Sequence, residues 1–227
     1  MPVDKDVIID AVDVNKEYRR AGAIIRALVD INLTIKSGEF IVIQGPTGCG
    51  KSTLLNVLSG LDLPDSGKII FDGENIARAT ETRLAKIRRQ KVGMVFQDFN
   101  LIKTLTAMEN VESMLWPTVL SNKEIENRGI VALRDVNMLE RKDHFPVEMS
   151  GGEKQRVAIA RAIVGKPRVV FADEPSGNLD PDSENQIMEL LKNINRDYET
   201  TILCVSHRDS VAKHGDRIVK MDNGRIV

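Results

Sequence analysis

The chain has 227 residues with 32 Lys or Arg and 33 Asp or Glu, and its formal net charge of −1 at pH 7 excludes a global positive field for nucleic acid. No stretch approaches the ~18 consecutive apolar residues of a membrane-spanning helix, and the first residues do not form a signal peptide. We therefore expect a cytoplasmic protein that binds no nucleic acid directly and reaches a membrane only through a partner.

The chain begins with two predicted strands, at residues 8–14 and 29–35, and the second alternates apolar and polar residues. Residues 16–20 are expected to connect them and include Tyr18. An aromatic ring at this place could stack on a purine base, because it offers apolar area and a π-face. Packing or a place at the rim of the fold is the alternative for Tyr18, and it stays open.

A phosphate-binding loop is predicted next, because residues 45–52 match the spacing G-x-x-x-x-G-K-[ST]. An apolar strand at 40–43 precedes it, and a helix from Thr53 to Leu58 follows, as the motif requires. Glycines let backbone N–H groups surround phosphate oxygens, while the lysine neutralises charge and the serine hydroxyl can bind Mg²⁺. The expected ligand residues are Gly45, Pro46, Thr47, Gly48, Cys49, Gly50, Lys51, Ser52 and Thr53.

A turn at 64–67, a strand at 68–73 and a basic helix at 82–90 come next, and the strand at 92–96 ends in Gln97. From residue 104 to about 138 the pattern is helical, with capping boxes that begin at Thr106 and Ser121. We expect two or three helices here, forming an insertion with its own small core.

Parallel strands alternating with helices are predicted for the rest of the chain. Strands at 169–172 and 201–205 are followed by Asp173-Glu174 and by His207, and a helix begins near Ser183. Asn223-Gly224 predicts a hairpin. Because ligands bind at the carboxyl ends of parallel strands, the phosphate-binding loop, Gln97, Asp173-Glu174 and His207 should lie at one edge of a sheet.

Four side chains at this edge have the chemistry of nucleotide hydrolysis. Asp173 can hold Mg²⁺, and Glu174 can act as general base on the attacking water. His207 could bind a γ-phosphate, and Gln97 could contact Mg²⁺ or orient the water. Singly, each has a plain structural alternative, such as a turn histidine, a solvated glutamine or carboxylates that cap a helix, but together beside the loop they indicate catalysis.

A second anion site is predicted at Ser150, Gly151, Gly152 and Glu153, where a capping box leaves backbone N–H groups bare at a helix start. It implies another ligand or the ligand of another subunit, unless it is an ordinary helix start.

These motifs, in this order, resemble the ATPase of ABC transporters over nearly the whole chain. Within that family, residues 87–97, 99–111 and 172–180 are similar to the MacB/LolD/FtsE branch of macrolide exporters and lipoprotein-releasing systems. The resemblance implies one α/β domain: a P-loop NTPase core with a parallel sheet and an N-terminal antiparallel β subdomain at 1–97 and 146–227, and an inserted α-helical subdomain at 98–145.

The resemblance also implies partners and further roles. Two copies would meet head to tail around two MgATP, each ATP lying between the phosphate-binding loop of one copy and the Ser150–Glu153 edge of the other, with Asp180 at the seam. Tyr18 would stack on adenine, and Gln97 would relay the γ-phosphate to the insertion. An integral membrane permease, bound at the cytoplasmic face of the inner membrane, would export or extract a lipophilic or peptide-like cargo.

Two other functions are alternatives to transport. The ATPase could move a membrane partner without any cargo, as FtsE-like proteins of cell division are thought to do. A nucleic-acid-linked ATPase would need coiled-coil insertions, tandem halves or a basic face, which this sequence lacks. The sequence also departs from the family pattern at three positions: Met149 and Glu153 should be tolerated, whereas Cys49 should be a reactive thiol whose alkylation blocks the ATPase.

Overall fold

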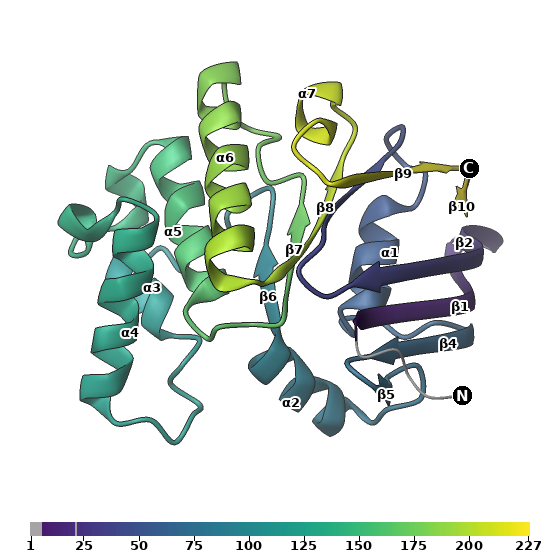
Figure 1. Ribbon diagram of the computed structural model, residues 1–227, viewed down its shortest axis with the longest axis horizontal. Coiled ribbons are helices and arrows are strands. Elements are labelled where there is room, and N and C mark those ends of the chain that lie inside the picture. Colours follow the sequence, from purple (N-terminus) through teal and green to yellow (C-terminus); the bar gives the residue numbers. More distant parts are fainter. Residues whose placement is uncertain (1–5, 21) are drawn as a thin grey trace.

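The computed structural model describes residues 6–20 and 22–227, which form two sheets and flanking helices (Figure 1). The strands are β1 (Val7–Arg20), β2 (Ala23–Lys36), β3 (Phe40–Gln44), β4 (Ser66–Phe71), β5 (Glu74–Asn75), β6 (Val92–Val95), β7 (Val169–Asp173), β8 (Thr201–Ser206), β9 (Arg217–Asp222) and β10 (Arg225–Ile226). The helices are α1 (Lys51–Leu58), α2 (Glu81–Lys91), α3 (Ala107–Glu112), α4 (Asn122–Asp135), α5 (Gly151–Ile163), α6 (Pro181–Tyr198) and α7 (Asp209–Ala212), with 3₁₀ turns at Leu139–Arg141 and Pro146–Glu148.

The main sheet has the strand order β10-β9-β3-β8-β7-β6, and every neighbouring pair from β9 to β6 is parallel. The second sheet, β2-β1-β4-β5, is antiparallel. Both agree with the predicted fold class. The inner strands β3, β7 and β8 are short and almost wholly buried, because helices or the second sheet cover both faces of the main sheet there.

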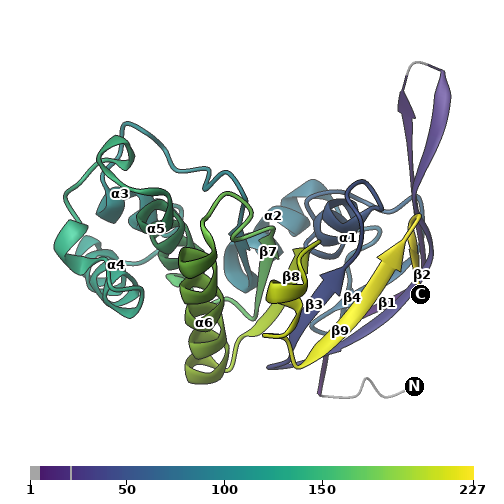
Figure 2. The ribbon, with the colours of Figure 1, turned by 90° about the horizontal axis from the view of Figure 1, so that it is seen from above.

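Each face of the main sheet has its own hydrophobic cluster, since neighbouring residues on a strand point to opposite faces. Ile41, Phe171 and Leu203 pack in the cluster that contains α1 and the antiparallel sheet. Val42 and Cys204 pack in the other cluster with α5 and α6. Figure 2 shows this layering, with α3 to α6 on one side of the parallel strands and α1 on the other.

The predicted connection at 16–20 is wrong, because β1 continues to Arg20 and pairs with β2 along its length. The register shifts between Ala11 and Val14, between Val14 and Lys16, and between Lys16 and Glu17. These irregularities interrupt the alternation by which a strand is recognised in sequence. Tyr18 therefore lies within a strand, opposite Ile25.

The helical segment does not have a core of its own, contrary to the prediction. Its buried residues Val111 and Leu133 belong to the same cluster as residues of α5, α6 and the main sheet, such as Val42. α5 contacts α3 and α4 as well as β6, so it joins the two parts. The capping boxes of α3, α4 and α5 form as predicted, with Thr106, Ser121 and Ser150 as N-caps. Among the described residues, no helix combines the length and hydrophobicity that crossing a membrane requires.

Candidate nucleotide-binding site

The predicted phosphate-binding loop joins β3 to α1, and its glycines are required by close backbone approach. A Cβ on Gly45 would lie 2.1 Å from the carbonyl oxygen of Met221, and one on Gly50 would lie 2.3 Å from that of Ala27. Gly50 also has a φ of 105°, which residues with a side chain rarely adopt. The hairpin β9–β10 therefore packs against the loop, and the N–H of Gly224 donates to the carbonyl of Cys49 at 2.9 Å.

Lys51 is folded over the same loop. Its Nζ donates to the carbonyl oxygens of Gly45 at 2.8 Å and Pro46 at 3.0 Å. The residue is only 6% exposed, so its charge is held at the loop rather than in solvent. Ser52 and Thr53 follow in the first turn of α1, where the helix dipole also favours an anion.

Ser52 and Asp173 form the pair predicted to hold Mg²⁺. Ser52 Oγ donates to Asp173 Oδ1 at 2.9 Å, although 121 residues separate them. Burial raises the pKa of Asp173, and the nearby Glu174 adds to the rise, while the Ser52 hydrogen bond opposes it. A hydroxyl and a half-buried carboxylate are the hard oxygen donors that Mg²⁺ prefers, and a dication would favour the ionised carboxylate. These residues therefore fit the metal.

Glu174 follows β7 with a φ of 46°, a strained backbone for a residue with a side chain. Its Oε1 lies 3.0 Å from Nδ1 of His207, and its Oε2 accepts from Ser206 Oγ at 3.3 Å. β7 and β8 are adjacent, so the ends of these two strands bring together the proposed base and the proposed γ-phosphate ligand. The predicted meeting of Glu174 and His207 at one edge is thus observed.

Gln97 contacts a different group. Its Nε2 lies 3.4 Å from Oδ1 of Asn178, and its carbonyl accepts from Asn178 Nδ2 at 3.2 Å. Asn178 Nδ2 also donates to Asp98 at 3.0 Å. No hydrogen bond among the described residues joins Gln97 to Ser52 or Asp173. Its metal role stays a prediction, whereas its link to the segment after β7 is a finding.

The second predicted anion site lies at the start of α5. Ser150 Oγ accepts from the N–H of Glu153 at 3.3 Å, and Glu153 Oε2 accepts from the N–H of Ser150 at 2.8 Å. The backbone hydrogen bond from Ser150 lowers the pKa of Glu153. Asp180 caps the neighbouring helix α6 through the N–H groups of Asp182 and Ser183. Both helices cover the face of the sheet opposite to α1.

Two sequence expectations need qualification. Cys49 is 6% exposed and packs in the cluster that contains Leu54 and Met221, so burial argues against the ready alkylation that the sequence suggested. Tyr18 is 38% exposed, and its hydroxyl donates to Asp62 at 2.8 Å. Burial and Asp62 raise the pKa of Tyr18 to about 12. Its stacking role stays a prediction.

An ion pair between a partly exposed arginine and a buried glutamate lies beside the site and has no signal in the sequence. Arg208 Nη1 donates to Glu184 at 2.6 Å, and its Nη2 donates to the carbonyl of Gly177 at 3.1 Å. Ser176 and Ser210 also donate to the Glu184 carboxylate. The pair joins the segment after β7 to the segment after β8, next to His207. Arg208 and Glu184 lie far apart in sequence, so only the fold reveals them.

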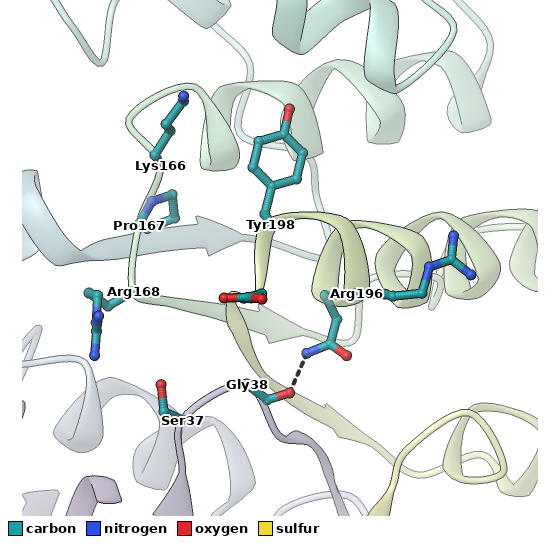
Figure 3. A pocket seen from close by; sticks show the side chains of 9 residues that line it. Ser37, Gly38, Lys166, Pro167, Arg168, Arg196 and Tyr198 are labelled. Carbon is teal, nitrogen blue, oxygen red and sulfur yellow. Dashed lines mark hydrogen bonds between the residues drawn. The ribbon is translucent and has the colours of Figure 1, made fainter. Parts of the chain in front are cut away.

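A hollow of about 560 Å³ at the amino ends of β3, β7 and β8 contains none of these predicted residues. Figure 3 shows its lining, which includes Ser37, Lys166, Arg168 and Tyr198, with Asn195 donating to the carbonyl of Gly38 at 2.8 Å. The candidate nucleotide site lies at the opposite edge of the sheet, where β3, β7 and β8 end.

Comparison with known proteins identifies the fold and its chemistry. Residues 28–177 match the ABC transporter family. The chain belongs to this family. The ATP-binding cassette MJ0796 of Methanocaldococcus jannaschii is 40% identical, with a TM-score of 0.88 and 96% of each chain covered, in a structure described as dimeric, post-hydrolysis and bound to ADP and Pi.

Relatives of this ABC cassette differ in what their names say of transport. The macrolide export protein MacB of Chlorobaculum tepidum is 40% identical over 97% of this chain and 34% of its own length. The methionine import protein MetN 1 of Rhodopseudomonas palustris is 42% identical over 97% of this chain and 59% of its own. The predicted family, its fold class, ATPase activity and the cofactors ATP and Mg²⁺ are confirmed. MacB agrees with the predicted branch, while direction and cargo are not specified.

Proposed function

We propose that two copies of this ABC cassette close head to tail around two MgATP and, by opening after hydrolysis, drive a membrane permease. The proposed dimer rests on where the chain places its two candidate anion-binding segments. The phosphate-binding loop leads into α1 on one face of the main sheet, whereas the Ser150–Glu153 edge begins α5 on the other. A single chain thus carries its two candidate anion-binding segments on opposite faces of the sheet. In a two-fold dimer, the loop of one copy can meet the Ser150–Glu153 edge of the other. The dimeric structure of the MJ0796 cassette with ADP and Pi supports a dimer.

Different residues of this chain bind the phosphates, hold the metal and transfer the proton. Lys51 and the loop amides bind the phosphates, while Ser52 and Asp173 would hold Mg²⁺, which when bound polarises phosphoryl oxygens. Glu174 takes a proton from the attacking water, and His207, 3.0 Å from it, orients the carboxylate and the γ-phosphate. Gln97 senses the phosphate through its contact with the segment 176–180, Asp180 lies at the seam, and Tyr18 stacks on the adenine.

A negative charge introduced at Ser150 tests the proposed head-to-tail dimer. Asp caps a helix as well as Ser does, so Ser150→Asp should keep α5 folded while its negative charge repels the phosphates bound by the other copy. In a Glu174→Gln background, we expect ATP to produce dimers in analytical ultracentrifugation, and the added Ser150→Asp to abolish them while ATP still binds. Ser121→Asp is the matched control, because Ser121 forms the same capping box on α4. Dimers that persist with Ser150→Asp would refute the sandwich.

A hollow of about 320 Å³ supports the permease contact. It is lined by Asp98, Phe99, Leu101, Lys103, Pro146, Val147 and Lys154, so it lies beside the Gln97 segment and the start of α5. Val147 is 83% exposed there. An apolar hollow of this kind suits the short cytoplasmic helix of a membrane subunit. This contact would place the protein peripherally at the cytoplasmic face of the cell membrane.

Co-purification from detergent extracts of the native cells tests this contact. We expect mass spectrometry to find an integral membrane subunit with the tagged chain, and Val147→Asp to lose at least about 90% of it, because a charge would have to be desolvated in the hollow. Val119→Asp, at a fully exposed valine outside the hollow, should retain it. Equal recovery with both variants would place the docking surface elsewhere.

The cargo is proposed to be lipophilic or peptide-like and exported or extracted, in line with the MacB resemblance. A regulator that moves its membrane partner without cargo, of the FtsE-like kind, is the alternative. The identity of the co-purified subunit separates the two, because a transporter subunit must provide a path or a cavity for cargo.

A further inference from the structure

Asp62 lies at the centre of a polar cluster that the catalytic machinery does not use. Its Oδ2 accepts from the hydroxyl of Tyr18 at 2.8 Å, and its Oδ1 accepts from Nζ of Lys16 at 2.8 Å. Lys16 also donates to the carbonyl of Leu63 at 2.7 Å, and the N–H of Leu63 donates to Asp62 Oδ1 at 2.7 Å. One carboxylate therefore receives a hydroxyl, an ammonium and a backbone N–H.

The cluster is attached to the helix that follows the phosphate-binding loop. Asp62 lies four residues beyond the end of α1 at Leu58, and the N–H groups of Leu61 and Asp62 donate to the carbonyl of Asn56 at 2.9 and 3.1 Å. The carboxylate that holds the ring of Tyr18 on β1 is thus fixed to the same helix that presents the phosphate-binding amides.

The charges in the cluster favour one fixed arrangement. Hydrogen bonds from Lys16 and Tyr18 lower the pKa of Asp62 against the opposing effect of burial, so the carboxylate is ionised at neutral pH. The raised pKa of Tyr18 keeps its hydroxyl protonated as a donor. Lys16 Nζ also lies 5.2 Å from the centroid of the Tyr18 ring, so a cation covers part of the ring.

We propose that Asp62 is a positioning residue for nucleotide binding: it holds the ring of Tyr18 in the orientation that stacks on the base, at a set place relative to the phosphate-binding loop. The inference rests on the proposed stacking role of Tyr18. The ring is 38% exposed and an untethered side chain would sample several rotamers, whereas a tethered one loses little freedom when the base arrives.

The test compares Mg-ADP with Mg-pyrophosphate in calorimetric titrations, because pyrophosphate occupies the phosphate subsite and has no base. Tyr18→Ala should weaken ADP binding about 5- to 100-fold. Asp62→Ala and Tyr18→Phe should each weaken it about 3- to 10-fold, since both break the tether and keep the ring. Pyrophosphate affinity should change less than about twofold in all three variants.

Two further variants make the test specific. Asp65→Ala is the matched control: this carboxylate lies on the same loop and accepts from the backbone N–H of Glu17 on β1, but makes no hydrogen bond to the Tyr18 hydroxyl. It should leave ADP affinity unchanged. Adding Asp62→Ala to Tyr18→Ala should produce no further loss, because the carboxylate acts through the ring. If Asp62→Ala has a lower melting temperature, Asp62→Leu replaces it, because leucine has a similar shape and cannot accept a hydrogen bond from the Tyr18 hydroxyl.

The outcomes separate the inference from the proposal beneath it. If Tyr18→Ala leaves ADP affinity intact, the stacking role fails and the inference fails with it. If Tyr18→Ala weakens ADP binding and Asp62→Ala does not, the inference alone is overturned. It is also overturned if pyrophosphate binding falls equally, or if the double variant is additive. Electrostatics alone predicts the opposite sign, since removing a carboxylate should favour an anion.

Discussion

Glu174→Gln should lower the rate of ATP hydrolysis about 100- to 1,000-fold while ATP still binds, because the amide cannot accept the proton of the attacking water. Gln keeps the size of the side chain and an oxygen that Ser206 can still reach, so the site should stay assembled. Phosphate release and ATP binding, measured on the same preparation, check this.

The matched control for this substitution is Glu199→Gln. Glu199 also has a positive φ, of 51° against 46° for Glu174, but it precedes β8 at the opposite edge of the main sheet. We expect the control to hydrolyse ATP at the unmodified rate. Unchanged turnover in Glu174→Gln would remove Glu174 as the base and turn attention to His207.

Lys51→Met should weaken ATP binding at least about 100-fold, because the ammonium can make two or more charge-assisted hydrogen bonds to phosphate, each contributing ~1.5–3 kcal/mol. The methionine fills similar space, while the carbonyl oxygens of Gly45 and Pro46 lose the lysine donor at 2.8 and 3.0 Å, and that of Pro46 keeps the N–H of Cys49 at 3.3 Å. Calorimetry with ATP measures the loss, and the melting temperature reports whether the loop stays folded.

Lys68→Met serves as the comparison, since Lys68 is an exposed lysine on β4. Its ATP affinity should match that of the unmodified protein within about twofold. If Lys51→Met bound ATP as tightly as this control, the loop amides alone would account for phosphate binding.

The sequence could predict the parts of the site that depend on local order. The glycine and lysine spacing of residues 45–52 and the apolar strands that end at Asp173 and Ser206 place the catalytic groups, because parallel strands end at a common edge. The capping boxes could be predicted for the same reason, since Ser150 and Glu153 interact across a single turn.

Features that depend on contact between distant segments could not be predicted. The register shifts in β1 interrupt the alternation of apolar and polar residues, so the sequence pattern does not show that the strand continues to Arg20. The hydrogen bonds from Asn178 to Gln97 and from Arg208 to Glu184 depend on loop conformations that are fixed only when the whole chain has packed. The burial of Cys49 could not be predicted either, because the hairpin that packs against its loop is contributed by residues 217–226.

Because the hairpin β9–β10 contacts the phosphate-binding loop, the loop can be completed only late in the synthesis of the chain. Gly224 donates to Cys49 and Met221 abuts Gly45, across some 175 residues of chain, and β3 itself pairs with β8 and β9. Contacts of such long range form late in folding. A ribosome-bound chain that already displays the whole glycine motif should therefore be unable to capture nucleotide until its last strands have emerged from the exit tunnel.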